Sequence, residues 1–246
     1  MLLALDIERV EPLADGAPFG EAGPYERVIA TARGEVDPAH PGNKGIALID
    51  KAPRNAAGKV EYKTDVFILR PRDPARGNRR LLYEVNNRGR KMLFGNIADG
   101  PQGVNDPKTL ADLGNAFPLR RGYTIVWSGW DPDAPRANMG LALTAPIATD
   151  NGQPIVQTVR EEWVSGTRLG LLETFKLSHE AATLEQNRAR LTVRECADDE
   201  PRELPLNQWS FVDSRSIRLR DDTKAQPGYL YEFHYDAKNP KVQGDR

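Results

Sequence analysis

Two stretches decide the expected fold: residues 81–91, LLYEVNNRGRK, and residues 123–133, YTIVWSGWDPD. Each begins as an apolar run, Leu81–Val85 or Tyr123–Ser128, and then changes abruptly into polar residues that include a glycine. This pattern is typical of a core strand followed by a loop. In open α/β sheets the loops at the carboxyl ends of neighbouring strands project into one crevice, where ligands and catalytic groups gather. We therefore expect these two loops to lie together.

Composition narrows the class of protein. The 246 residues include 34 basic and 35 acidic side chains, and the net charge of -1 provides no field that would attract nucleic acid or an anionic membrane. No apolar run approaches the roughly 20 residues of a membrane helix, and Met1–Asp6 lacks the basic flank of a signal peptide. The single cysteine, Cys196, predicts no disulfide. We expect a soluble globular protein and leave its compartment open.

Residues 1–75 are expected to form a β-rich N-terminal region. Apolar and polar residues alternate strictly over Ala4–Glu11, which is typical of a half-buried strand. Further strands are predicted over Tyr25–Glu35, Lys44–Asp50 and Val60–Arg70, with proline and glycine between them. This spacing predicts an antiparallel meander.

Residues 76–134 have an α/β character. More than thirty residues separate the two apolar runs, and they include a short helix that is expected to end at Gly114. A strand, a long connection with a helical piece and a second strand are what a parallel crossover requires. The expected fold class is therefore α/β with large β-rich additions, in which strand content exceeds helix content.

Residues 135–246 are expected to form a second β-rich region. One helix is predicted there, over Ser178–Arg188, with Ser178 or Thr183 as its cap. The predicted strands are Gly140–Ile147, Ile155–Val164, Ala189–Arg194, Ser216–Leu219 and Tyr229–Tyr235.

The chain lacks the usual marks of a complete catalytic site. No serine lies in Gly-x-Ser-x-Gly, the turn that exposes a hydrolase nucleophile; Ser128 and Ser165 each have one glycine in the wrong place. The histidines, at positions 40, 179 and 234, have no metal-binding spacing. Asp131 and Asp133 could bind a cation, but solvated turn carboxylates are the commoner case. We expect no metal and no cofactor.

The loop Asn86–Lys91 is the most suggestive stretch for chemistry. A glycine-bearing turn after a strand can offer backbone N–H groups to a developing oxyanion, and asparagine side chains can add donors. An ordinary polar loop, whose arginines pair with acidic neighbours, is the other interpretation. From these residues alone the ordinary loop is the commoner case.

Five stretches resemble the N-terminal portion of a family of large bacterial α/β-hydrolase-domain proteins. They span nearly the whole chain in the family's order, and together they are more specific than any one alone. The stretches are Gly23–Arg27, Gly34–Pro38, Leu82–Gly89, Arg121–Trp130 and Tyr231–Pro240.

The resemblance implies that 81–85 and 123–128 are early parallel strands of a hydrolase-like sheet, with Asn87, Arg88 and Gly89 in its oxyanion loop. It also implies that Asn86, Trp130 and Asp131 contribute to the substrate pocket. In such proteins the serine, acid and histidine come from sequence further on. The resemblance thus implies the N-terminal segment of a serine hydrolase for an ester or related acyl compound.

Two other classes of function stay open. One is a non-catalytic β-rich binding or assembly module that uses exposed aromatic residues such as Trp163 and Trp209, although a core position is the commoner one for tryptophan. The other is a metal-dependent lyase or hydrolase that uses the aspartates. The expected partners are a small acyl or ester substrate and the remainder of the catalytic domain or a partner chain. A truncated parallel sheet exposes an edge and an apolar face, which predicts a homo-oligomer or aggregation without that partner.

Overall fold

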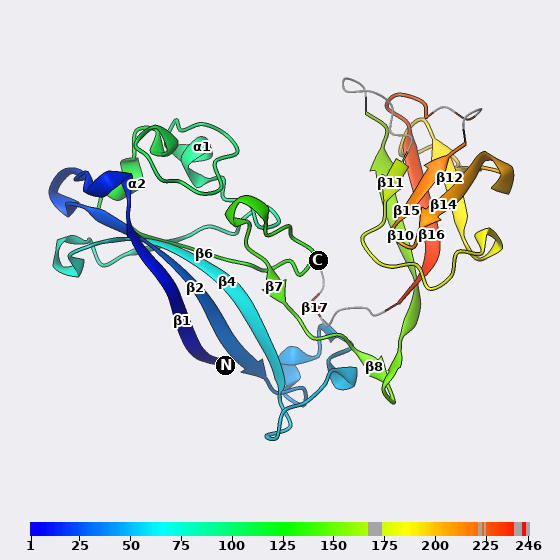
Figure 1. Cartoon of the computed structure of the whole chain (residues 1–246), viewed down its shortest axis with the longest axis horizontal. Coiled ribbons are helices and arrows are strands. Elements are labelled where there is room, and N and C mark those ends of the chain that lie inside the picture. The colour runs from blue at the N-terminus through cyan, green and yellow to red at the C-terminus, as the bar shows by residue number, and fades with distance from the viewer. Residues whose placement is uncertain (167–173, 221–222, 224, 239–242, 245–246) are drawn as a thin grey trace. The chain divides into compact units, whose positions relative to one another are not determined.

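The computed structural model describes residues 1–166, 174–220, 223, 225–238 and 243–244. The chain divides into two compact units, one comprising Met1–Pro146 with the chain end from Gln243, the other Ile147–Val242. Figure 1 colours the first unit mainly from blue to green and the second from green to red. The longest helix among the described residues has only five residues. The prediction that strands exceed helices is confirmed.

One six-stranded sheet forms the centre of the first unit. Its strand order is β1-β2-β4-β6-β5, and β7 pairs with β4 near the start of that strand. The first three strands are an antiparallel meander, as the spacing predicts. The strands are β1 (Leu2–Pro12), β2 (Tyr25–Val36), β4 (Val60–Pro71), β5 (Leu81–Tyr83), β6 (Thr124–Ser128) and β7 (Leu143–Thr144).

The two apolar runs pair in parallel, which confirms the predicted crossover. Leu82 of β5 lies opposite Ile125 of β6, and β6 in turn pairs antiparallel with β4. The predicted regions 1–75 and 76–134 therefore contribute strands to one sheet. Strand β5 has only three residues, and the Glu84 N–H that follows it makes one more bond to β6, to Val126 O at 3.2 Å.

The main core of this unit lies on one face of the sheet. Cross-strand neighbours Ile29, Phe67 and Trp127 form one buried row on that face. Two short helices, α1 (Leu93–Ile97) and α2 (Phe117–Arg120), pack on the same core, and Figure 1 shows both on one side of the sheet. The remaining cover consists of loops and single 3-10 turns.

The opposite face of the sheet is also apolar but is less covered. Strand alternation places Val28, Ile68, Val126 and Tyr83 in one cross-strand row there. Tyr83 at the end of this row is 46% exposed. We call this surface the outer face.

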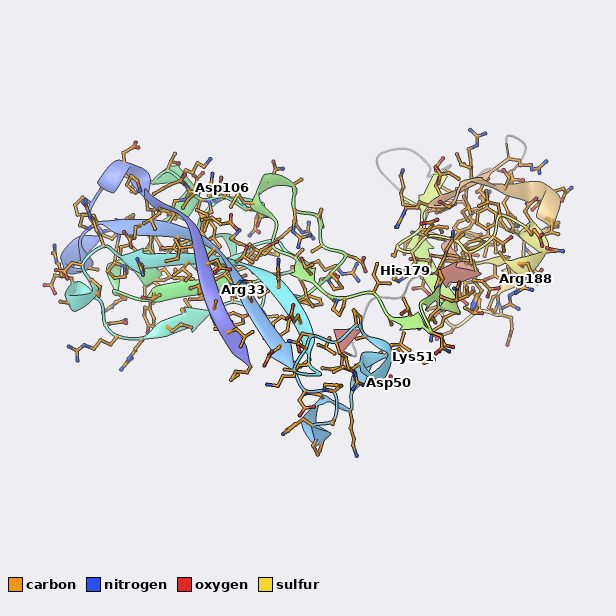
Figure 2. The ribbon with its side chains drawn as sticks, turned by 60° about the horizontal axis from the view of Figure 1, so that its bottom comes forward. Arg33, Asp50, Lys51, Asp106, His179 and Arg188 are labelled. Atoms are coloured by element: carbon orange, nitrogen blue, oxygen red, sulfur yellow. The ribbon has the colours of Figure 1, made fainter. Side chains whose placement is uncertain are left out.

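A buried arginine joins the sheet to the loops that cover it. The Arg27 guanidinium is only 4% exposed and pairs with Asp106 and Glu11, with its carbon 5.7 Å from the centre of the Phe67 ring. A second arginine, Arg33, pairs with Asp6 on the same sheet but is 47% exposed. Figure 2 labels Asp106 among the covering loops and Arg33 on the sheet near β1.

The second unit is built from two antiparallel sheets that share one aromatic core. Trp209, Phe175 and Phe233 are fully buried there, and the Trp209 and Phe233 rings meet edge to face at 5.3 Å. The first sheet is β10-β16-β12-β13 and the second β11-β15-β14. The strands are β10 (Val156–Val164), β11 (Thr174–Lys176), β12 (Arg190–Arg194), β13 (Arg202–Glu203), β14 (Trp209–Asp213), β15 (Ser216–Leu219) and β16 (Leu230–Lys238).

Two pairs of very short strands complete the fold. In the first unit, β3 (Ile46–Ala47) pairs with β17 (Gln243–Gly244). In the second unit, β8 (Thr149–Asp150) pairs with β9 (Gln153–Pro154).

The predicted helix over Ser178–Arg188 is wrong. Only Gln186–Arg188 is helical, as a single 3-10 turn. The reason is competition for the backbone donors: Ala181 N–H donates to Ser214 O and Ala182 N–H to Asp236 O. Neighbouring segments thus take the hydrogen bonds that a helix would need.

Other predicted elements are shorter than expected. The helix before Gly114 is one 3-10 turn, Ala111–Leu113. The strand over 44–50 is reduced to β3, and the strand over 140–147 to β7. In the last case the Leu141 N–H donates to Gly89 O, so part of the segment bonds to a loop instead of a strand.

The ion pairs of Arg27 and Arg33 can be compared in a stability test, because one is buried and the other is exposed. Asp106→Ala should lower the free energy of unfolding by about 3 kcal/mol, because it removes a partner from a buried charge. Asp6→Ala should have a much smaller effect, because its arginine is solvated. Urea unfolding followed by circular dichroism measures both, and equal losses would contradict the assignment of Arg27 as a buried anchor.

Candidate functional site

Asn86 joins the loop after β5 to the loop after β6. This buried side chain donates from Nδ2 to Ser128 O at 2.7 Å, and its backbone oxygen accepts from Trp130 Nε1 at 2.8 Å. The loops that follow the two parallel strands therefore lie together, as the sheet rule predicts.

Residues Asn87–Arg90 form a tight turn at this junction. Asn87 and Arg90 exchange both backbone hydrogen bonds, at 3.0 and 3.1 Å, and the central residues Arg88 and Gly89 have φ values of 48° and 83°. Two successive positive φ values are typical of a type I′ turn. The Gly89 N–H donates to Asn86 Oδ1 at 2.7 Å. Within the described residues, the Arg88 N–H is the one amide of this turn without an acceptor.

Gly89 fits where no other residue would. Its oxygen accepts from Leu141 N–H at 3.1 Å, which draws the two backbones into contact. A Cβ atom at position 89 would lie 2.6 Å from Leu141 O, and the residue's φ is one that L side chains rarely adopt. The turn is therefore held against the segment around 141 through its glycine.

Asp131 and Trp130 flank the turn. The Asp131 side chain is buried, accepts from Asp133 N–H at 2.9 Å, and has Oδ2 at 3.6 Å from Arg88 Nε. The Trp130 indole is 39% exposed, although its N–H is bonded to Asn86. The six residues predicted for the site thus come from two adjoining loops.

Glu84 positions the start of this region, and the sequence analysis did not single it out. Its carboxylate accepts from Trp127 Nε1 and from the N–H groups of Met92, at 3.1 Å, and Leu93, at 3.2 Å. It therefore connects β5, β6 and the beginning of α1. The sequence signal that could have identified Glu84 is an acidic residue within an otherwise apolar run.

Lys91 is the second residue that sequence reasoning missed. Its ammonium group donates to Asn105 O and Met139 O, both at 2.8 Å, and lies 4.4 Å from the centre of the Phe67 ring. Burial lowers the pKa of Lys91 to about 7, and nearby Asp106 partly opposes that shift. The lysine holds two covering loops together beneath the turn.

Among the residues that the structure describes, no pair of a nucleophile and a base is found at these loops. Ser128 Oγ lies 2.7 Å from the Tyr83 hydroxyl, and Ser165 is buried in the second unit. His40 accepts from Gly42 N–H at 3.1 Å, and His234 Nε2 is 2.6 Å from Glu232 Oε1 on the same strand. No group of three or more metal-binding side chains is found within the described residues.

Trp209 belongs to the core of the second unit, and Trp163 packs against that core. Trp209 is fully buried, and the Trp163 ring packs 5.0 Å from that of Phe175. The interpretation as a core residue is confirmed for Trp209, whereas Trp163 is partly buried against that core. No described helix is long and apolar enough to cross a membrane.

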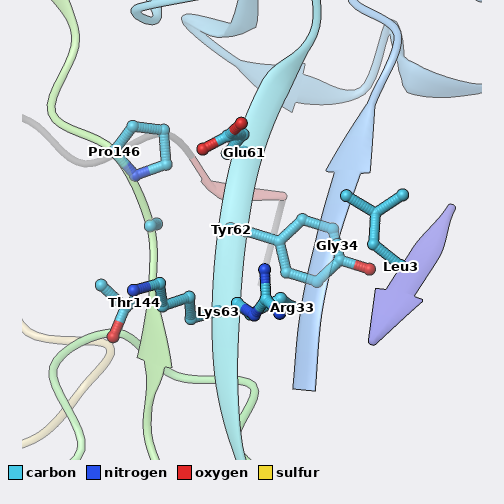
Figure 3. Close-up of a pocket in the computed structure, with 9 residues that line it drawn as sticks. Leu3, Arg33, Gly34, Glu61, Tyr62, Lys63, Thr144 and Pro146 are labelled. Carbon is cyan, nitrogen blue, oxygen red and sulfur yellow. The ribbon is translucent and has the colours of Figure 1, made fainter. Parts of the chain in front are cut away.

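A cavity of about 300 Å³ is lined by residues near the end of β2, the start of β4 and the segment that begins at Thr144. Figure 3 shows the Tyr62 ring lying over Gly34, with Leu3 beside it. A Cβ at Gly34 would lie 2.3 Å from Tyr62 Cζ, so the ring occupies the space that the glycine leaves. None of the six predicted site residues lines this cavity.

Comparisons of the chain with protein-family models, curated proteins and solved structures each found no match.

A pair of glycine substitutions tests the packing of the turn. Gly58→Ala, at a φ of 74° in open space, should cost about 1 kcal/mol of stability from backbone strain alone. Gly89→Ala should cost about 3 kcal/mol or more, because the added carbon also meets the Leu141 backbone. Urea unfolding of both variants gives the comparison. Equal costs would show that residues 89 and 141 are not in close contact.

The buried lysine predicts a pH-dependent stability. The unfolded state holds the Lys91 proton up to a pKa near 10.5, whereas the folded state releases it from about pH 7. The unfolded state therefore binds more protons between pH 7 and 10, and folding should gain up to about 1.4 kcal/mol per pH unit there.

Lys91→Met should remove this contribution, so that the difference in unfolding free energy between the variant and the wild type changes with pH. Chemical denaturation at pH 7, 8 and 9 measures it, with the exposed Lys44→Met as the control. A difference that is constant with pH would contradict the prediction.

Proposed function

We propose that this chain contributes the oxyanion-binding side of a serine hydrolase of the α/β-hydrolase type, which acts on an ester or related acyl compound. The observation that carries the proposal is the junction of two loops at the carboxyl ends of the parallel strands β5 and β6. Ligand sites of open α/β sheets gather at such an edge.

The Arg88 N–H is the proposed oxyanion donor. When a nucleophile attacks an acyl carbon, negative charge develops on the carbonyl oxygen, and a fixed N–H group stabilises it without reorganisation. The Gly89 N–H is engaged by Asn86, so it serves to hold the turn while Arg88 presents its amide. The Arg88 guanidinium, 62% exposed, adds positive charge beside the same turn.

The remaining predicted site residues take supporting roles in this proposal. Trp130 offers a half-exposed aromatic surface as a pocket wall for the acyl or alcohol group. Asp131 restrains Arg88, and Asn86 fixes the spacing of the two loops.

The nucleophile, base and acid of this proposed site come from outside residues 1–246. The sequence holds no Gly-x-Ser-x-Gly turn, and the described Ser128 hydroxyl is bonded to a tyrosine instead of a histidine. In this proposal a serine supplied by another segment or chain, activated by a histidine, would attack the acyl carbon, and the oxyanion would face Arg88.

Labelling with a fluorophosphonate probe tests the proposal. Residues 1–246 alone should not react, whereas a polypeptide that joins them to the catalytic remainder should be labelled and should hydrolyse a p-nitrophenyl ester. Ser128→Ala in the longer polypeptide should retain labelling. Absence of labelling in the longer polypeptide, or labelling of 1–246 that Ser128→Ala abolishes, would overturn the proposal.

A further inference from the structure

Exposed arginines gather at the end of the first unit's sheet where β5 and β6 begin. Two arginines precede each of these parallel strands, and β4, which runs antiparallel to β6, is followed by two more. Figure 1 shows α2 at this end of the sheet. The loops of the candidate site follow the opposite ends of β5 and β6. We call these residues the arginine patch: Arg72, Arg76, Arg79, Arg80, Arg120 and Arg121.

Backbone contacts bring the segments of the arginine patch together. The Asn78 N–H donates to Gly122 O at 2.9 Å, and the Thr124 N–H donates to Arg80 O at 3.0 Å. A Cβ atom at Gly122 would lie 3.5 Å from Arg76 O. The segment that follows β4 therefore packs on the segment that precedes β6, so that their arginines share one surface.

The positive charge of this surface is not neutralised by direct contacts. Within the described part of the chain, none of the six guanidinium groups forms an ion pair. Arg76 and Arg120 donate to backbone oxygens, those of Glu21 at 2.8 Å and Asn115 at 3.0 Å. The Asp73 carboxylate accepts instead from the backbone N–H two residues further along its own turn.

The charge of the chain is unevenly distributed. The net charge is -1, and without the arginine patch it would be -7. In physiological salt, exposed charges more than about 8 Å apart are largely screened from one another. A partner that touches this end of the sheet therefore meets the local positive charge. The net charge of the whole chain, which predicts no attraction to an anionic surface, averages over this difference.

Exposed apolar side chains border the arginines. The Phe117 side chain is 47% exposed, and the Arg121 N–H donates to Phe117 O, so the two residues lie one helical turn apart on the same face of α2. Leu81 directly follows Arg80 and is 62% exposed. Each of the two packed segments thus presents an apolar side chain next to its arginines.

We propose that the arginine patch binds the surface of an anionic membrane. Guanidinium groups form strong bidentate hydrogen bonds with lipid phosphates, while Phe117 and Leu81 enter the boundary between headgroups and acyl chains. A lipid surface engages both features of the patch, whereas a nucleic acid would pair with the arginines and leave the aliphatic Leu81 in water. The inference is independent of the hydrolase proposal.

Removal of two charges tests the electrostatic part of the proposal. Arg79 has a φ of 61°, which glycine adopts more readily than arginine, so Arg79→Gly removes the charge without straining the turn. Combined with Arg80→Gln, it should weaken vesicle binding about thirtyfold, since each basic side chain near an anionic surface contributes about fivefold. The matched control is Arg202→Gln with Arg218→Gln, which removes two exposed arginines from the second unit.

Removal of the apolar side chains separates a lipid surface from a soluble polyanion. Phe117→Ser combined with Leu81→Thr should weaken vesicle binding about tenfold, because both side chains lose their burial in the lipid boundary. Its control is Leu206→Ser, at a side chain of the second unit that is 43% exposed.

Flotation with phosphatidylcholine vesicles that contain about 30% phosphatidylserine, in about 0.1 M salt, measures the binding. Circular dichroism shows whether each variant is folded. Phosphatidylcholine vesicles alone should bind weakly, and single-stranded oligothymidine should not release the chain from anionic vesicles. Absence of binding to anionic vesicles would overturn the proposal, as would binding of either patch variant at the level of its control. Competition by the oligonucleotide would assign the patch to nucleic acid instead.

Discussion

The hydrogen bonds of two polar side chains set the position of β5, and the loops of the candidate site depend on that position. A three-residue strand at the edge of a sheet has too short a ladder to hold itself in place. Glu84 ties its end to Trp127 and to the start of α1, and Asn86 ties the following loop to β6. Because these groups are partly or fully buried, their bonds are made in a low-dielectric setting where losing a partner is costly.

Two buried cations beneath the loops also hold the covering segments in place by polar contacts. Arg27 and Lys91 both lie near the Phe67 ring, and each reaches outward to a covering segment, Arg27 to Asp106 and Lys91 to the backbone at Asn105 and Met139. Helices usually cover the faces of parallel sheets, whereas the described strands of this sheet pair antiparallel except for β5 and β6. Here irregular loops cover much of the core face of the sheet. The buried cations, each bonded to several acceptors, fix the positions of these loops, which the short helices alone would not do.

Regular strands could be predicted from sequence because their pattern is long. Val60–Pro71 shows enough alternation for the pattern alone to identify it. The prediction for segment 178–188 was wrong because the backbone amides of this segment donate to the carbonyl oxygens of Ser214 and Asp236, which are distant in sequence, instead of forming a helix. Tertiary partners of that kind cannot be recognised from the local sequence.

The candidate site, too, could be predicted from the sequence only in part. That the two loops meet follows from the rule for parallel strands, and Asn86–Gly89 could be singled out in advance. Which amide of the turn stays available could not, because the Asn86 side chain occupies the Gly89 N–H only in the folded geometry. Likewise, nothing local shows that Lys91 is buried against Phe67.

The fluorescence of Trp130 can report on the junction of the two loops. Its indole is half-exposed and bonded to the backbone of Asn86, whereas Trp127 and Trp209 are shielded from solvent. Collisional quenchers such as acrylamide would therefore reach the emission of Trp130 far more readily than that of those two indoles. Any rearrangement of the turn would change the polarity around this ring first, so the native fluorescence of the chain can report on the loops without an attached dye.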